Sequence, residues 1–262
     1  MNNALNWFFP TCGTPMVLDI STLEITIIVF AFVLGGFCKG VSGIGVPLIA
    51  VPVIATVTDI TLAIILVAIP SVVPNFYQVW RFRNSWTGDF SLFYLSIFAI
   101  AGSGVGILIL TSADPELLSQ YLGVILIGYY IIRHSQPFYL NDRATRLLAG
   151  PMGFLSGLAG GMTGVSAPVI LIFMTAVKLR REAFIFGISV YFIAMGSGQF
   201  VWLMNAGLMT IHLAVWSSLT LLPIALGMSL GQQIGKHMSH KQFEYLIQLL
   251  ALALGVKLLT NL

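Results

Sequence analysis

Charged residues are what this sequence has least of: Asp, Glu, Lys and Arg make up 8% of its 262 residues, whereas apolar residues make up 58%. A soluble domain carries roughly 25% charged residues, so this chain cannot cover a water-exposed surface. Its mean hydropathy is +0.96. The sequence therefore predicts an integral membrane protein. At about 20 residues per crossing plus short loops, its length accommodates roughly eight to ten crossings.

The sequence also lacks the motifs of the common catalytic classes. It contains no HExxH, no P-loop, no nucleophile elbow and no pair of intramembrane carboxylates. We therefore expect no enzyme, cofactor or metal site. Basic residues are scattered between apolar runs, which disfavours a nucleic-acid partner. The shortage of buried acids also disfavours cation transport, because proton and sodium sites usually contain at least one.

Cysteine is nearly absent, with Cys12 in the leading tail and Cys38 in an apolar segment. We expect no disulfide between them, since they should lie at different depths. Residues 1–20 carry no Lys or Arg and no clean small-residue cleavage site, so a removable signal peptide is not expected. His237 and His240 lie in a basic loop with no third ligand nearby, which is typical of a surface pair.

Glycine and proline are abundant at two places, and there the sequence repeats itself. A pattern of three glycines and a proline occurs twice, 121 residues apart. It comprises Gly36, Gly40, Gly43 and Pro47 in the first half and Gly157, Gly161, Gly164 and Pro168 in the second. Such a density of glycine and proline cannot continue an ordinary helix. In a membrane, the backbone at a break must be buried in protein or face a wet cavity. Two matched breaks in two halves are typical of a secondary transporter's substrate site.

Ten apolar runs can be recognised, five on each side of a polar stretch: 24–38, 44–57, 60–80, 90–110, 117–132, 147–162, 165–177, 184–205, 213–235 and 245–260. We predict an all-α polytopic membrane protein made of two inverted repeats, with glycine-broken or re-entrant helices at the centre. The boundaries are a tail over 1–23, repeat 1 over 24–133, a connector over 134–146 and repeat 2 over 147–262. The short runs beside each glycine motif are either thin, tilted crossings or re-entrant hairpins.

The basic residues alternate between the gaps that separate these runs. Odd-numbered gaps hold eleven of the twelve Lys and Arg residues, Lys257 in the last run being the exception, and even-numbered gaps hold none. The positive-inside rule then places the odd gaps and the connector in the cytoplasm, and both termini in the periplasm.

The two breaks are the best candidates for a substrate site. We expect backbone N–H groups near Gly43 and Gly164 to hold a small oxyanion. The candidate side chains are Ser42, Asn75, Gln78, Thr163, Ser166 and Gln199, where Thr163 repeats Ser42 and Gln199 repeats Gln78. Two alternatives stay open: the glycines serve close helix packing, and the polar side chains join helices through hydrogen bonds. Lys39 is either a cation that snorkels to the surface or a counter-charge for the substrate.

At its two glycine motifs the chain resembles the sulfite exporter TauE/SafE family of bacterial membrane permeases. The residues that carry the likeness are Gly36-Phe37-x-x-Gly40-x-x-Gly43-x-Gly45, with Pro52 downstream, and Gly157-x-x-Gly160-Gly161-x-x-Gly164-x-x-x-Pro168. The resemblance covers essentially the whole chain. It implies transport, commonly outward, of small sulfur oxyanions or organosulfonates across the bacterial inner membrane.

The expected function is therefore secondary transport of a small anion such as sulfite. The expected partners are that anion and membrane lipid, and a homo-oligomer is left open. Two alternatives are an importer of thiosulfate or a similar compound that uses Cys38 as a transient thiol contact, and a membrane scaffold without transport activity.

Overall fold

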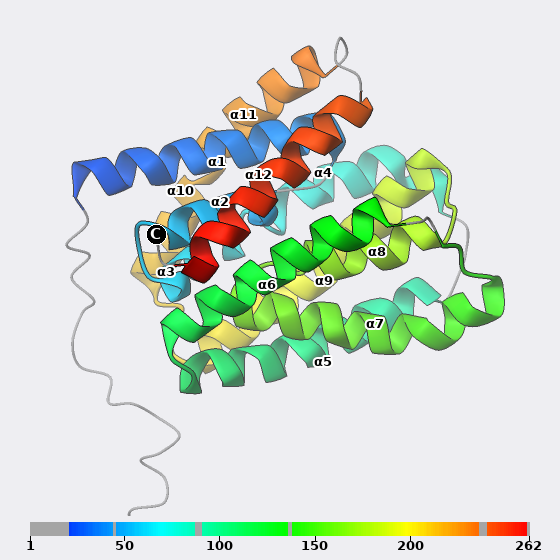
Figure 1. Cartoon of the computed structure of the whole chain (residues 1–262), viewed down its shortest axis with the longest axis horizontal. Coiled ribbons are helices and arrows are strands. Elements are labelled where there is room, and N and C mark those ends of the chain that lie inside the picture. Colours follow the sequence, from blue (N-terminus) through cyan, green and yellow to red (C-terminus); the bar gives the residue numbers. More distant parts are fainter. Residues whose placement is uncertain (1–20, 44–45, 87–90, 136–137, 236–239, 261–262) are drawn as a thin grey trace, which may run out of the picture.

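The computed structural model describes residues 21–43, 46–86, 91–135, 138–235 and 240–260, and every regular element in these ranges is helical (Figure 1). The first half contains α1 (Thr22–Ser42), α2 (Val46–Ala55), α3 (Ile60–Ala68), α4 (Val73–Phe82), the 3-10 turn η1 (Arg83–Ser85), α5 (Ser91–Ser112) and α6 (Pro115–His134). The second half contains α7 (Asp142–Thr163), α8 (Ala167–Ala176), α9 (Arg181–Asn205), α10 (Ile211–Leu219), α11 (Leu221–Ile234) and α12 (His240–Thr260).

The helix boundaries follow the sequence repeat. Both ends of α8 lie 121 residues after the corresponding ends of α2, and α7 ends 121 residues after α1. All ten predicted elements form, but two of them are broken. The run at 60–80 becomes α3 and α4, bent by 43°, with Pro70 in the bend and Pro74 in the first turn of α4. The run at 213–235 becomes α10 and α11, which meet at Thr220.

Fewer helices meet the length and composition of a membrane span than the ten predicted elements. In the described residues, five helices have the length and composition of a membrane span, or six if the bent α3–α4 pair counts as one. In this count α10 and α11 are taken together as Ile211–Ile234, and the short apolar helices α2 and α8 are left out. With 10 residues each, α2 and α8 are about 15 Å long, half of the ~30 Å hydrocarbon core. The polytopic all-α class is thus confirmed, with five or six candidate membrane spans in the described residues.

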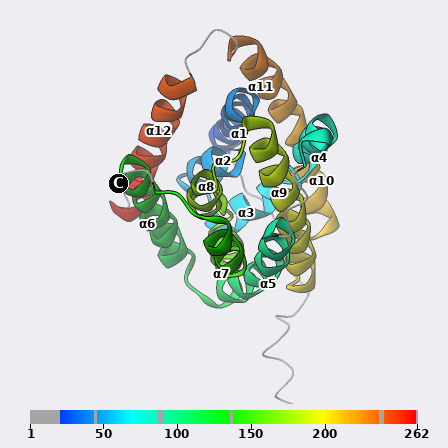
Figure 2. The same ribbon diagram turned by 90° about the vertical axis from the view of Figure 1, so that its right-hand side faces the viewer.

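The short helices α2 and α8 lie inside a ring of longer helices (Figure 2). Around them, α1 packs along α11, α5 along α7, α6 along α12 and α4 along α9. Nearly all of α2 and α3 is buried, with Ile49, Ile54 and Ile65 fully enclosed. The start of α1 and the end of α12 lie at one end of the molecule, whereas the α6–α7 connection lies at the opposite end (Figure 1).

Four of the repeated glycines pack helices together. Gly36 and Gly40 of α1 lie against the backbone of α11, and Gly157 and Gly161 of α7 lie against the backbone of α5. A Cβ atom at any of these four positions would overlap a backbone carbonyl oxygen of the neighbouring helix. The G-x-x-x-G spacing aligns the two glycines of each helix on one face, as in close membrane helix pairs. Close packing therefore accounts for these glycines.

We predict that Gly157→Ala destabilises the folded protein by about 1–3 kcal/mol, because the added methyl group forces α7 and α5 apart. Gly128→Ala in α6 is the matched control, since a Cβ there would meet no atom within 4 Å. In a helix interior that change is neutral or stabilising by up to about 1 kcal/mol. Thermal unfolding in detergent measures both variants. Equal unfolding temperatures for the two would show that the α5–α7 contact does not need a glycine.

Candidate functional site

The remaining pair of repeated glycines, Gly43 and Gly164, ends helices α1 and α7. Gly43 closes α1 at φ +82° and Gly164 closes α7 at φ +75°, in the left-handed region that favours glycine. Their N–H groups donate to the carbonyls of Lys39 and Gly160, each at 2.8 Å. Both of these amide hydrogens are thus used inside the caps, so neither of the two is free to hold an anion.

Each break lies against a helix from the other half of the chain. The space beside Gly43 is bounded by Ile185 of α9 and by the Gln78 side chain, whereas the space beside Gly164 is bounded by Ile64 of α3 and by Val51. Ile64 and Ile185 are themselves separated by 121 residues. The two breaks therefore make equivalent contacts across the two halves.

Lys39, in the last turn of α1, is turned inward. Its side chain is only 4% exposed. Its ammonium donates to Asn75 Oδ1 at 2.8 Å, to Gln78 Oε1 at 3.2 Å and to the carbonyl of Gly43 at 3.4 Å. A snorkelling lysine would instead extend its ammonium group into water.

The amides around Lys39 are held in turn by their neighbours. Gln78 Nε2 donates to the Gly43 carbonyl at 3.1 Å, and Ser189 of α9 donates to Gln78 Oε1 at 3.0 Å. Asn75 Nδ2 donates to the carbonyl of Ser71, which lies in the break between α3 and α4. Each amide thus presents its oxygen to the lysine. These acceptors are neutral, and within the described part of the chain no carboxylate pairs with Lys39, so its charge is solvated by dipoles and is available to an anion.

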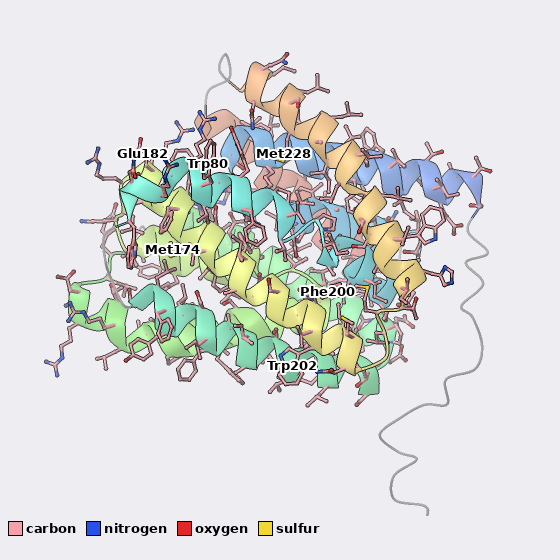
Figure 3. The ribbon with its side chains drawn as sticks, turned by 180° about the vertical axis from the view of Figure 1, so that it is seen from behind. Trp80, Met174, Glu182, Phe200, Trp202 and Met228 are labelled. Atoms are coloured by element: carbon pink, nitrogen blue, oxygen red, sulfur yellow. The ribbon has the colours of Figure 1, made fainter. Side chains whose placement is uncertain are left out.

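Lys39 forms part of the wall of a cleft of about 660 Å³ bounded by α1, α4, α9 and α11. Ser42, Gly43 and Gln78 line the same cleft, and Arg81 and Arg181 add two further positive charges. Figure 3 labels Trp80 on α4 and Met228 on α11; both helices contribute residues to the cleft wall, Met228 among them. The cleft combines basic side chains with amide and hydroxyl donors, a combination that suits a small oxyanion.

The candidate residues of the second break lie apart from this cleft. Thr163 and Ser166 are buried, and Thr163 donates to the Ala159 carbonyl at 2.8 Å. Gln199 Nε2 donates to the Gly160 carbonyl at 2.9 Å. None of the three, nor Gly164, lines the cleft. The nine predicted site residues therefore form two groups: five around Lys39 and four around Gly164.

Arg81 and Arg181 in the cleft wall, and Ser189 behind Gln78, were not predicted as site residues. Arg81 follows Asn75 and Gln78 at a spacing of three, so the helical face that carries those amides could have identified it. Arg181 and Ser189 come from α9, and the sequence holds no signal that brings them to α1.

The predicted thiol contact is not supported by the position of Cys38. Its side chain is 3% exposed and packs with Val41, Ile49 and Phe243, and Cys38 does not line the cleft. Cys12, His237 and the side chain of His240 fall outside the described residues. In the described part of the chain, no three His, Cys, Asp or Glu side chains gather as a metal site would require.

An all-helical membrane protein with paired helix breaks and a basic cleft has the architecture of a secondary transporter. The model of the sulfite exporter TauE/SafE family matches residues 27–258, and the chain belongs to this family. It is thus a membrane transporter of sulfur-containing anions and not an enzyme. Comparison with curated proteins and with solved structures gives no match.

Proposed function

We propose that the protein exports sulfite or a related small sulfonate, with Lys39 as the counter-charge of the transported anion. The supporting observation is the buried ammonium of Lys39, which has only neutral acceptors and lies in the wall of a basic cleft. A buried charge without an ionic partner is costly, and an incoming anion removes that cost. Hydrogen bonds to charged groups contribute about 1.5–3 kcal/mol, so this contact strengthens anion binding by roughly ten- to a hundredfold.

In this proposal the anion lies beside Lys39, Ser42 and Gly43 and replaces one of the neutral acceptors of the ammonium. Rotation of the Gln78 or Asn75 amide then turns an N–H group toward a sulfite oxygen. Arg81 and Arg181 draw the anion into the cleft through their long-range field. Each neutral hydrogen bond contributes about 0.5–1.5 kcal/mol, so a single alanine substitution at Asn75 or Gln78 weakens binding roughly two- to tenfold.

We further propose that the two halves are inverted repeats whose interface provides alternating access. The matching helix boundaries and the equivalent contacts of Gly43 with Ile185 and of Gly164 with Ile64 support this arrangement. The transport path is then closed at the second break, where Thr163, Gly164, Ser166 and Gln199 are enclosed. The anion meets this break after the repeats rock against each other.

The orientation in the bacterial inner membrane follows from the basic residues. The C-terminal ends of α1, α4 and α6, where Lys39, Arg81 and Arg133 lie, belong to the odd-numbered gaps that the positive-inside rule places in the cytoplasm. The cleft then opens toward the cytoplasm, and both termini are periplasmic. Export of an anion from a cell that is negative inside is favourable by about 2.3 kcal/mol per charge per 100 mV. A uniporter with no ion-binding carboxylate would therefore be sufficient.

Flux measurements in liposomes test the proposed function. We expect the purified protein to carry sulfite down its gradient and Lys39→Gln to lose at least tenfold in flux, because the anion loses its counter-charge. Lys257→Gln is the matched control, since Lys257 lies on an exposed position of α12 and lines none of the cavities described. Equal flux in both variants would refute the role of Lys39, and absence of flux for sulfite, thiosulfate and sulfoacetate would refute the substrate class.

The topology yields a separate prediction. Reporter fusions after residue 262 should be active in the periplasm, and a reporter inserted near residue 137 should be active in the cytoplasm. Because an odd number of elements per repeat inverts the second half, a cytoplasmic C-terminus would rule out the proposed inversion.

A further inference from the structure

A second, smaller pocket lies next to the cleft. It has a volume of about 90 Å³ and is bounded by residues of α2, α6, α8, α9 and α12. Ser42, Arg181 and Ile185 line both the pocket and the cleft, so these three residues separate them. The family assignment and the Lys39 site leave this pocket without a role.

Gln248 is the most informative residue of the pocket. It lies on α12, is 6% exposed and faces the pocket, yet no hydrogen bond to its amide is found within the described part of the chain. Among the described residues Ser96 alone has a fully enclosed side-chain polar atom without a partner, so the Gln248 amide is open to the pocket and can donate to a ligand there.

The repeat does not explain this amide. Tyr121 and Tyr245 correspond at an offset of 124, which pairs Gln248 with Val124. Val124 is 54% exposed on the outside of the helix bundle. The fold of the first half therefore has no need of a polar side chain at this position, and the glutamine belongs specifically to the pocket.

The other polar side chains of the pocket set its charge. Arg133 of α6 and Arg181 of α9 both line it and carry its positive charge, and Tyr129, Thr175 and Ser42 add hydroxyl groups. No Asp or Glu lines it among the described residues. Two guanidinium groups disfavour a cation, and their planar N–H groups match the oxygens of a tetrahedral or pyramidal oxyanion.

We propose that this pocket binds a second small oxyanion, with the Gln248 amide as donor and Arg133 and Arg181 as counter-charges. The shared chemistry allows two sources, a dissolved sulfur oxyanion or the phosphate of a lipid headgroup. In the first case, which rests on the proposed function, the anion binds in the pocket before it enters the cleft. Arg181 lines both the pocket and the cleft, and it passes the anion from one to the other. The binding itself depends on the pocket's own side chains and not on Lys39.

Calorimetric titration of the purified protein with sulfite in a zwitterionic detergent tests this proposal. We expect two equivalents of sulfite in the unmodified protein and one in Gln248→Glu, because the new carboxylate keeps the size of the side chain but repels the anion. Gln248→Leu should also retain one equivalent. Gln120→Leu on α6 is the matched control, since Gln120 lines neither compartment, and it should retain two.

The variants separate this site from the Lys39 site. Lys39→Gln should lose the other equivalent, and if it retains both, the proposed role of Lys39 fails while the second site stands. Two equivalents in Gln248→Glu, or a single equivalent in the unmodified protein that Gln248→Glu keeps, would overturn the second site. Repeating the titration in nanodiscs identifies its source. Loss of the second equivalent on adding phosphatidylglycerol to phosphatidylcholine indicates a headgroup phosphate, whereas an unchanged count indicates the dissolved anion.

Discussion

The burial of one ammonium group constrains the rest of the site. Lys39 ends a membrane helix, yet its charge is turned toward α4, where two amide oxygens and the Gly43 carbonyl receive it. Such an arrangement needs a helix that stops within reach, a second helix that carries acceptors on one face, and a third that fixes them. The glycine cap, the Asn75–Gln78 face of α4 and Ser189 of α9 meet these three needs. Because α9 belongs to the second half, the charge couples the two halves of the chain.

The glycines of the repeated motif have two different structural roles. Gly36 and Gly157 remove side chains so that neighbouring helices approach closely, whereas Gly43 and Gly164 adopt a backbone shape that ends the helix. The interpretations of packing and of helix break are therefore both correct, at different positions of one motif. Close packing holds α1 and α7 rigidly against their partners. Each helix break is therefore held at a fixed place. At equivalent positions beside the two breaks, the first half has Lys39 and the second half has Gly160, so only the first break carries a charge.

Much of the architecture could be predicted from the sequence, because hydropathy and glycine spacing are local signals. The ten elements, the breaks at Gly43 and Gly164 and the grouping of Asn75 with Gln78 follow from them. The half-length of α2 and α8 did not, since a short apolar run looks the same in a thin, tilted span and in a buried half-helix. The contributions of Arg181 and Ser189 depend on where α9 packs, which no local pattern encodes. The separation of Gln199 from the cleft could not be predicted either, because the repeat relates it to Gln78 without stating which half is open.

The central claim is that the transported anion binds against the Lys39 ammonium. Crystals of the protein soaked with selenite, a heavier analogue of sulfite, test it most directly through the anomalous signal of selenium. The account predicts a selenium peak in the cleft, with selenite oxygens within about 3 Å of Lys39 Nζ, and no peak there in crystals of Lys39→Gln. A cleft without selenium in the unmodified protein, at concentrations that support transport, would contradict it.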